Sequence, residues 1–197
     1  DNLGNLTCKS DVVGHACTPG STDYAYDPAH PHAVQSIAGL PGTYSYDADG
    51  NLTSSGTTGS SNNRAIIWSV DNLPTQIQGP NGTSNFAYGP DHQRYRQTQA
   101  DGTVTTYIGG LYEVISTNGG ATVQYRHNIV ADGQVIAVHT LDQSGNPSTR
   151  YLHYDHLGSV DAITDDTGVV VQRMSFYAFG KRRDPANWSN DLTATDI

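Results

Sequence analysis

The chain has 197 residues, a net charge of −9 at pH 7 and a hydrophobic share of 36%. An acidic chain offers no broad basic face to phosphate groups, so its composition excludes nucleic acid as a partner. No stretch approaches the roughly 20 consecutive apolar residues of a membrane-spanning helix, and we expect no insertion into a membrane.

Residues that favour strands and turns dominate the composition. The chain has 12 Tyr and 21 Gly, whereas Glu113 is its only glutamate and Lys9 and Lys181 are its only lysines. Glutamate and lysine are among the good helix formers that coat surface helices, and they are nearly absent. The composition therefore predicts an all-β fold made of antiparallel β-hairpins.

Near the start of the chain, Cys8 and Cys17 lie nine positions apart. A hairpin across the intervening residues would bring them opposite each other, and a disulfide would then form in an oxidising compartment. Two free thiols are the alternative, and the sequence leaves both open. Further along, His30 and His32 flank Pro31 in a predicted loop.

Short runs of β-branched and aromatic residues follow, separated by Asn-Gly and Asp-Gly pairs such as Asp101-Gly102. These pairs are the strongest local signal for a hairpin. The polar segment Gly56–Asn63 is predicted to be a loop insertion. The predicted strands are 64–70, 84–88, 94–99, 104–108, 111–116, 122–130, 134–139, 148–153, 160–164 and 169–176. We expect one repeat domain over 1–183 and a tail or return loop over 184–197.

One phrase recurs along the chain. Tyr46-Asp47, followed by Gly50-Asn51, reappears in truncated or altered form around residues 1, 26, 88 and 154. The separations are close to multiples of about 21 residues, which indicates a repeat architecture whose units must stack to bury apolar surface. The residues assigned a structural role in this motif are Tyr24, Tyr26, Asp27, Tyr44, Tyr46, Asp47, Gly50, Asn51, Tyr88, Tyr151, Tyr154, Asp155 and Gly158.

The phrase Tyr-x-Tyr-Asp-x-x-Gly-Asn-Leu-Thr at 44–53 resembles the YD repeat of the Rhs (rearrangement hot spot) proteins. The stretch 150–160, Arg-Tyr-Leu-His-Tyr-Asp-His-Leu-Gly-Ser-Val, and the stretch 176–183 resemble the last repeats before the Rhs core-associated domain. The resemblance implies a sheet that spirals into a partial β-shell, in a secreted or cell-surface protein. It implies no catalysis by the repeats. Nothing after Arg183 matches the self-cleaving core of bacterial members, so no autoproteolysis is expected.

Two groups of residues have the composition of metal sites. His153, Asp155 and His156 are close in sequence, but on a strand His156 would point away from the other two. Asp47 and the alternate residues after it are spaced like ligands of a calcium loop, yet the loop lacks the required Gly and Glu at its sixth and twelfth positions. Structural turns are the favoured interpretation of both. We therefore predict no catalytic residue, no metal and no cofactor.

The sequence thus predicts a non-enzymatic structural β-scaffold, secreted or on the cell surface. It would serve either as the shell wall of a protein like the polymorphic toxins or as the subunit of a self-assembling fibre. In both cases its open sheet ends would pair with adjoining repeats or with copies of itself. The alternative is an adhesin-like surface whose Tyr and Trp rings bind glycans.

Overall fold

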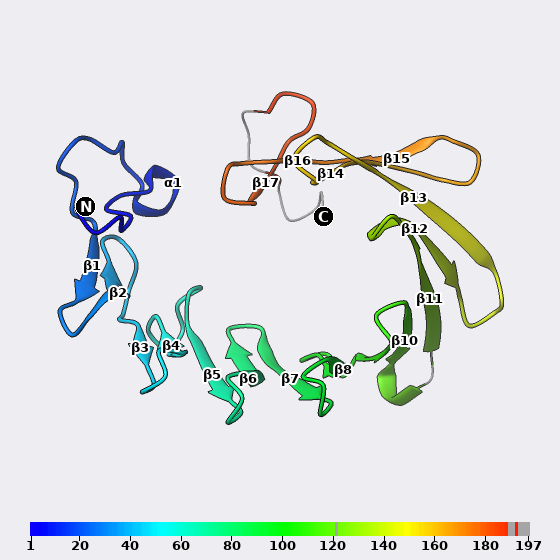
Figure 1. The fold of residues 1–197 in the computed structure, drawn as a ribbon, viewed down its shortest axis with the longest axis horizontal. Helices are drawn as coiled ribbons and strands as arrows, with labels where there is room; N and C mark the ends of the chain where they lie inside the picture. Colours follow the sequence, from blue (N-terminus) through cyan, green and yellow to red (C-terminus); the bar gives the residue numbers. More distant parts are fainter. Residues whose placement is uncertain (121, 189–191, 193–197) are drawn as a thin grey trace. The chain divides into compact units, whose positions relative to one another are not determined.

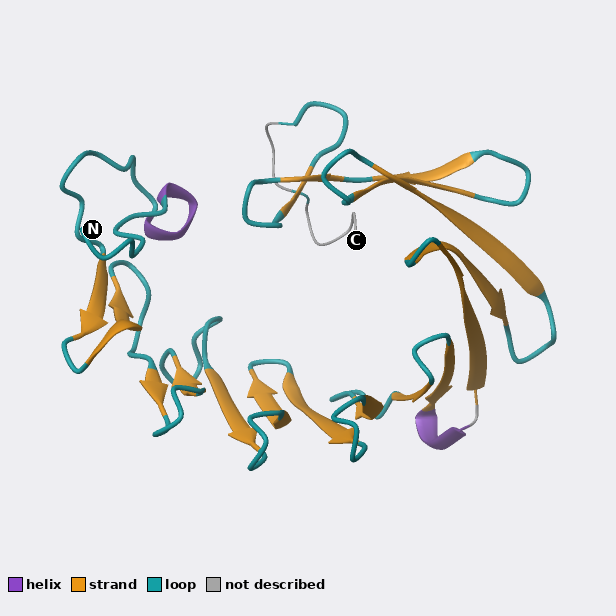
Figure 2. Cartoon of the chain, viewed as in Figure 1, coloured by secondary structure: helices purple, strands orange, loops and turns teal. Residues whose placement is uncertain are grey.

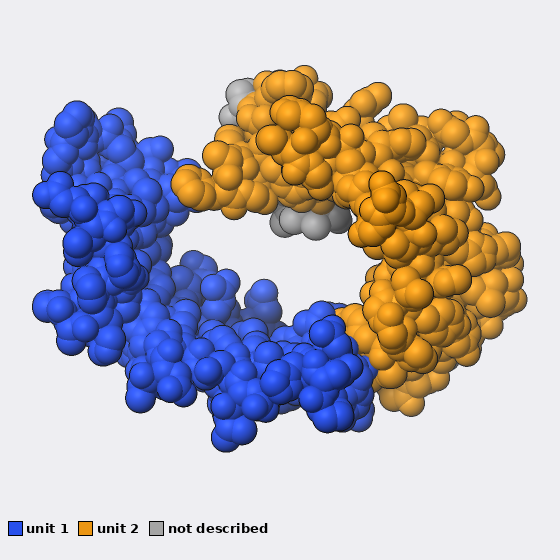
Figure 3. All heavy atoms as spheres, in the orientation of Figure 1, with its two compact units in different colours: residues 1–103 blue, residues 104–197 orange. Residues whose placement is uncertain are grey.

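The computed structural model describes residues 1–120, 122–188 and 192, and within them the chain is almost entirely β (Figure 2). The predicted all-β, antiparallel class is confirmed. The helices in these residues are a single turn, α1 (Ser10–Val13), and a short 3₁₀ segment, η1 (Asn118–Gly120). The chain divides into two compact units, Asp1–Thr103 and Val104–Ile197, which Figure 3 colours separately. The division into a repeat domain and a tail stays a prediction.

In the first unit, each strand pairs antiparallel with its neighbour in the chain, apart from one break between two sheets (Figure 1). A separate hairpin comes first, and a longer sheet follows in chain order. The hairpin consists of β1 (Tyr24–Asp27) and β2 (His30–Ile37). The longer sheet contains β3 (Ser45–Tyr46), β4 (Leu52–Ser55), β5 (Arg64–Trp68), β6 (Pro74–Gly79), β7 (Gly82–Tyr88) and β8 (Arg94–Thr98).

The second unit repeats this meander and ends in a small hairpin. Its sheet contains β9 (Val104–Ile108), β10 (Tyr112–Thr117), β11 (Thr122–Ala131), β12 (Gln134–Leu141), β13 (Pro147–Tyr154), β14 (Val160–Thr164) and β15 (Val170–Arg173). The hairpin pairs β16 (Ser175–Phe176) with β17 (Arg182–Arg183).

Each of the ten predicted strand ranges contains a strand, but the prediction missed several elements. The loop predicted around Pro31 is wrong, because His30 opens strand β2. Proline is tolerated near the start of a strand, where a missing N–H costs little. The long strand predicted over 169–176 is divided into β15 and β16 around Met174. The loop Gly56–Asn63 is found between β4 and β5.

Few side chains are fully covered. The buried residues of the described chain are small, namely Ala137, Ala162, Ser55 and Thr105, and no large side chain falls below 2% exposure. Burial of apolar surface is therefore modest, and the specificity of the fold must depend heavily on hydrogen bonds within and between hairpins. No helix in the described residues is long and apolar enough to cross a membrane.

Candidate functional site

A single five-residue turn recurs along the chain. Its first residue donates its N–H to the carbonyl of the fifth, and its fourth donates to the carbonyl of the first. In the turn 47–51 these N···O distances are 3.0 and 3.2 Å, and Gly50 has a φ of 86°. The pattern is a type I turn followed by a left-handed residue that forms a bulge. Within the described residues it closes nine turns, at 1–5, 47–51, 69–73, 89–93, 99–103, 142–146, 155–159, 165–169 and 177–181.

An aspartate at the first position stabilises the turn, because its carboxylate accepts hydrogen bonds from later residues of the same turn. Oδ1 of Asp47 accepts the N–H groups of Asp49 and Asn51 at 3.0 and 2.8 Å, and Oδ2 accepts the side-chain amide of Asn51 at 3.0 Å. The carboxylate thereby satisfies backbone donors that the turn would otherwise leave open. Asp1 makes the same contacts with Leu3 and Asn5, and Asp142 bonds Asn146 in the same way.

These hydrogen bonds favour the charged form of the carboxyl group. The side-chain amide of Asn51 is the main cause that lowers the pKa of Asp47. The amide of Asn146 lowers the pKa of Asp142 in the same manner. Since donors to a carboxylate stabilise its anion, the turns prefer ionised aspartate. This supports the assignment of the 47–51 phrase to a turn, with its carboxylate engaged by the chain itself.

Turns that lack this aspartate use other acceptors. Ser69 Oγ accepts the N–H groups of Asp71 and Leu73, each at 3.2 Å. In the turn 89–93, Gly89 has no side chain, and the carboxylate of Asp91 takes the N–H of Gln93 at 3.1 Å instead. The turn geometry therefore survives considerable change in its sequence.

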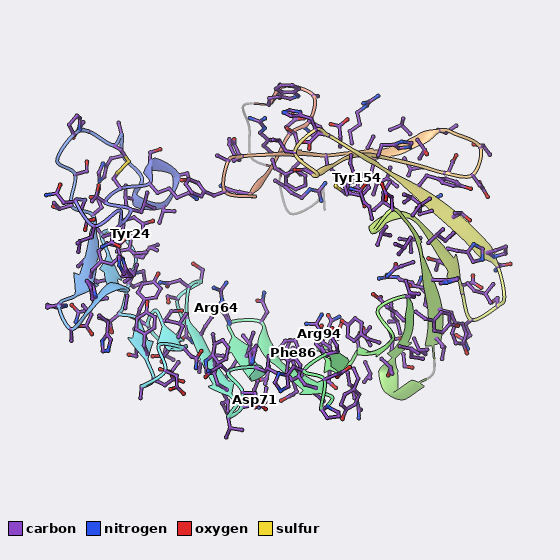
Figure 4. All side chains as sticks on the ribbon, viewed as in Figure 1. Tyr24, Arg64, Asp71, Phe86, Arg94 and Tyr154 are labelled. Carbon is purple, nitrogen blue, oxygen red and sulfur yellow. A yellow bond between two sulfur atoms is a disulfide. The ribbon has the colours of Figure 1, made fainter. Side chains whose placement is uncertain are left out.

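The aromatic residue just before a turn bonds to the preceding hairpin. The Tyr46 hydroxyl donates to the carbonyl of Val34 at 2.9 Å, and the Tyr88 hydroxyl donates to that of Pro74 at 2.9 Å. Tyr154, labelled in Figure 4, donates to the carbonyl of Val135. Tyr26 donates to Leu6 at 2.7 Å. The hydroxyls of Tyr46, Tyr88 and Tyr154 thus each join two successive hairpins, whereas that of Tyr26 joins the first hairpin to the segment before it.

Trp68 is a member of this series that the sequence motif missed. Its ring nitrogen donates to the carbonyl of Leu52 at 2.9 Å, and it stands directly before the turn that Ser69 begins. The 42-residue gap between Tyr46 and Tyr88 is therefore two periods, with Trp68 as the intermediate member. A search for any aromatic donor near the middle of that gap would have found it.

The asparagine that closes some turns also contacts the next hairpin along the chain. The Asn51 side-chain amide donates both to Asp47 and, at 2.7 Å, to Oδ1 of Asn72. The Asn5 amide donates to the carbonyl of Pro31 at 2.7 Å. These contacts explain why the Gly-Asn pair is part of the phrase: glycine provides the left-handed conformation, and asparagine links its turn to the next hairpin.

The first tyrosine of the phrase has a packing role. Tyr24 and Tyr44 are half-buried, and burial is the largest cause that raises the pKa of Tyr24. Phe86 is the corresponding residue two positions before Tyr88, and the guanidinium carbon of Arg94 lies 5.6 Å from its ring centre (Figure 4). Such packing requires only a flat apolar ring, so phenylalanine can replace tyrosine here.

The other aspartates and glycine of the motif have the same roles in their turns. Asp27 accepts the N–H of Ala29 at 2.8 Å, and Asp155 accepts those of Leu157 and Ser159 at 2.8 and 2.9 Å. Gly158 is the left-handed residue of its turn, with a φ of 84°. Tyr151 differs from the rest of the motif. It lies three residues before Tyr154, so strand alternation places it on the opposite face, and it is 43% exposed.

Cys8 and Cys17 are joined by a disulfide, visible as the yellow bond in Figure 4. Their Cα atoms are 5.7 Å apart. The expected hairpin between them is wrong, because Ser10–Val13 forms a helical turn that Gly14 ends in the left-handed conformation. The segment enclosed by this bond lies beside β1, where the N–H of Asp23 donates to the carbonyl of Thr7 at 2.9 Å.

In the described residues, the candidate metal ligands that converge are Cys8, His15 and Asp23. His153 bonds instead to the hydroxyl of Thr164 at 3.0 Å, and Asp155 is engaged in its turn. The structure thus brings together a set that the sequence did not indicate. His153 and Asp155, for which a structural turn was the favoured interpretation, make other contacts.

No family model and no curated protein matches the chain. Among solved structures, it is similar to a chain of the TcdB2–TccC3–Cdc42 crystal structure, with a TM-score of 0.51 and 15% identity over 81% of this chain. A chain of the TcdB2–TccC3 crystal structure gives a TM-score of 0.44 and 16% identity over 84% of this chain. This chain spans 12% and 8% of the length of those two chains. The first likeness shows a shared fold.

Proposed function

We propose that the chain is a non-enzymatic structural scaffold, a length of YD-repeat sheet in the wall of a secreted or cell-surface protein. The observation that carries this proposal is the series of hydroxyl and indole contacts between successive hairpins. The motif's most distinctive polar groups, the tyrosine hydroxyl and the aspartate carboxylate, are engaged by the chain's own backbone. They hold the sheet together, which leaves them unavailable for chemistry on a substrate.

Two further observations support this function. The fold is shared with a chain from a TcdB2–TccC3–Cdc42 complex that is much longer than this one. The motif resembles the repeats of Rhs proteins, in which such sheets form a shell. Both are expected of a scaffold segment, whose role is to extend a sheet by adding hairpins that contact their neighbours.

Deleting one complete repeat tests the scaffold directly. Removing residues 47–68 joins Tyr46 to Ser69, so that an aromatic residue still precedes an intact turn. We expect the shortened chain to keep its β circular dichroism and a cooperative unfolding transition. The matched control removes half a repeat, residues 58–68, which would bring β4 and β6 together in parallel directions. Loss of structure in both deletions, or in neither, would contradict the repeat scaffold.

Association with adjoining strands belongs to the same proposal. In the described residues β15 pairs only with β14, and Val169 and Val171 near its outer side are 59% and 45% exposed. An unpaired edge is a template for another strand, from an adjoining repeat or from a second copy. Light scattering and negative-stain microscopy should show assemblies that the edge substitution Val171→Lys reduces. Monomers in the wild-type chain at high concentration would exclude self-association.

One groove in the second unit favours the alternative, carbohydrate binding. It has a volume of about 820 Å³ and is lined by Asp155, Asp161 and the rings of Tyr177 and Trp188. Trp188 is 64% exposed, and the guanidinium of Arg183 lies 5.3 Å from its ring centre. Exposed rings beside carboxylates suit a sugar. A glycan array should then give hits that Trp188→Ala removes, and an array without hits would eliminate this function.

A further inference from the structure

Three potential metal ligands converge beside the first hairpin, and a second cysteine is bonded to one of them. One ligand atom each of Cys8, His15 and Asp23 lies within 4.8 Å of the others, and Cys17 is covalently joined to Cys8. Nε2 of His15 is 3.0 Å from Oδ1 of Asp23. All four residues fall within positions 8–23, on the loop between the first turn and β1.

The second carboxylate oxygen of Asp23 is an unusual feature of this group. Oδ2 of Asp23 is buried and has no hydrogen-bond partner within the described residues. A buried carboxylate oxygen normally has a donor, because leaving it without one costs free energy. An oxygen in this state, in the same carboxylate that contacts the His15 imidazole, is suited to a cation.

The histidine is oriented as a ligand would be. Nδ1 of His15 lies 3.1 Å from the carbonyl oxygen of Ala16, which can only accept a hydrogen bond. Nε2 lies 3.0 Å from Oδ1 of Asp23, which is also an acceptor, so both ring nitrogens donate here. On metal binding Nε2 would give up its proton and ligate the cation, while Nδ1–H keeps its contact with Ala16. Histidines that bind metals usually have this outer contact, because it fixes both the tautomer and the ring orientation.

We propose that reduction of the Cys8–Cys17 disulfide converts this group into a Zn²⁺ site with two thiolates, one imidazole and one carboxylate. A dithiol supplies two electrons and two protons, which yields two cysteine thiols and the cyclic disulfide of the reductant. Binding of Zn²⁺ then releases both thiol protons and the Nε2 proton of His15, because the metal binds thiolates and a deprotonated imidazole nitrogen. Zinc accepts four ligands of these types in tetrahedral geometry.

The disulfide and the metal would be alternative ways to close the same loop. The loop is anchored to the sheet independently of either, since the N–H groups of Asp23 and Tyr24 both donate to the carbonyl of Thr7, at 2.9 and 3.3 Å. The carbonyl of Asp23 also accepts the N–H of Ala38 at 2.7 Å. Asp23 is thus held in place by backbone contacts, which keeps one ligand positioned after reduction.

Cobalt titration tests the site, because tetrahedral Co²⁺ bound to thiolates has visible and near-ultraviolet bands. The whole chain is reduced with a dithiol, freed of reductant without oxygen, and titrated with Co²⁺ and then Zn²⁺. We expect one Co²⁺ per reduced chain, displaced by Zn²⁺, and no bands for the oxidised chain. The double variant Cys8→Ser/Cys17→Ser should lose the bands.

The other two ligands need separate variants. His15→Gln and Asp23→Asn should each weaken metal affinity at least tenfold, whereas the matched control His30→Gln, on an exposed histidine of the adjacent hairpin, should not. Far-ultraviolet circular dichroism shows that each variant retains its strands. Absence of thiolate bands in the reduced wild type would overturn the proposal. So would unchanged affinity in both ligand variants, since the metal would then bind the two thiols alone.

Discussion

Two side-chain contacts that act at different ranges recur along the chain. The aspartate carboxylate closes its own turn, as Asp47 does through Asp49 and Asn51. The aromatic donor before it reaches the preceding hairpin, as Tyr46 does at Val34. The first contact is local and determines the path of the chain, whereas the second fixes one hairpin against the next.

Tyr46→Phe should reveal the contribution of the longer contact. The substitution removes the hydroxyl that donates to Val34 and keeps the ring. We expect the free energy of unfolding to fall by about 0.5–1.5 kcal/mol, the usual net contribution of one hydrogen bond. Urea denaturation measures the change. The matched control is Tyr95→Phe, because the Tyr95 hydroxyl makes no hydrogen bond within the described residues and the ring is 49% exposed. Equal losses in both variants would contradict the role of the hydroxyl.

Gly50 is required for its backbone conformation. With a φ of 86° it lies in the left-handed region, although nothing stands within 4 Å of the position that a Cβ would take. Gly50→Ala should therefore destabilise the chain by about 1–2 kcal/mol through backbone strain alone. The control is Gly79→Ala in β6, where φ is not left-handed and the nearest atom would be 3.9 Å away. A chain that tolerates both changes equally in urea denaturation would disprove this explanation.

At the scale of elements, the period could be predicted from the sequence, whereas several strands could not. Tyr26, Tyr46 and Tyr88 stand in similar short sequences, and their spacing predicts a repeat of about 21 residues. Trp68 makes the same kind of hydrogen bond to the preceding hairpin through its indole nitrogen, so a motif defined by tyrosine missed it. Strand β6 begins at Pro74 and contains two glutamines, Gln76 and Gln78, which local propensity does not recognise as a strand. Pairing on both sides, with β5 and β7, determines its conformation.

The convergence of His15 and Asp23 with the cysteines was also beyond sequence reasoning. The helical turn Ser10–Val13 and the left-handed Gly14 bring His15 back towards β1, and neither has a strong local signal. The spacing of Cys8 and Cys17 made a disulfide plausible, but it did not indicate which side chains would surround it. Contacts of that kind depend on how a loop folds against a sheet.

The turns should respond to acid. Hydrogen bonds hold the pKa values of Asp27, Asp47, Asp101, Asp142 and Asp165 below their ordinary value of 3.8 in the folded chain. A lowered folded pKa means that the stabilisation is complete above the unfolded pKa, near 4, and is lost as the pH falls through the folded values. We expect the urea midpoint to fall as the pH drops below 4.

The variant Asp47→Asn isolates one turn in this titration. Asparagine retains an acceptor oxygen but cannot ionise, so the variant should be less stable at pH 7 and should lose less stability between pH 5 and pH 2. Asp49→Asn, in the same turn, is the control, because its side chain is exposed and accepts none of the turn's hydrogen bonds shown for Asp47. A wild-type midpoint that rises on acidification would refute the assignment.

At the scale of the whole molecule, stability should depend on the number of paired neighbours. Strands β6, β7, β11 and β12 are paired on both sides, whereas β3 and β15 each end a series of pairs within their unit. In repeat architectures stability is roughly the sum of such neighbour contacts. Hydrogen exchange should therefore be slowest in the doubly paired strands and fastest in β3 and β15. Uniform protection across all strands would contradict this dependence.

The scarcity of large buried side chains has a consequence for how such a sheet can evolve. Because backbone pairing, hydrogen-bonded turns and aromatic donors between several of the hairpins contribute most to the fold, many positions on both faces are left open to substitution. Substitutions could change the charge or the apolar character of either face while the backbone pairing is kept. The fold would persist while its sequence drifted, as the 15% identity to a chain of similar fold already illustrates.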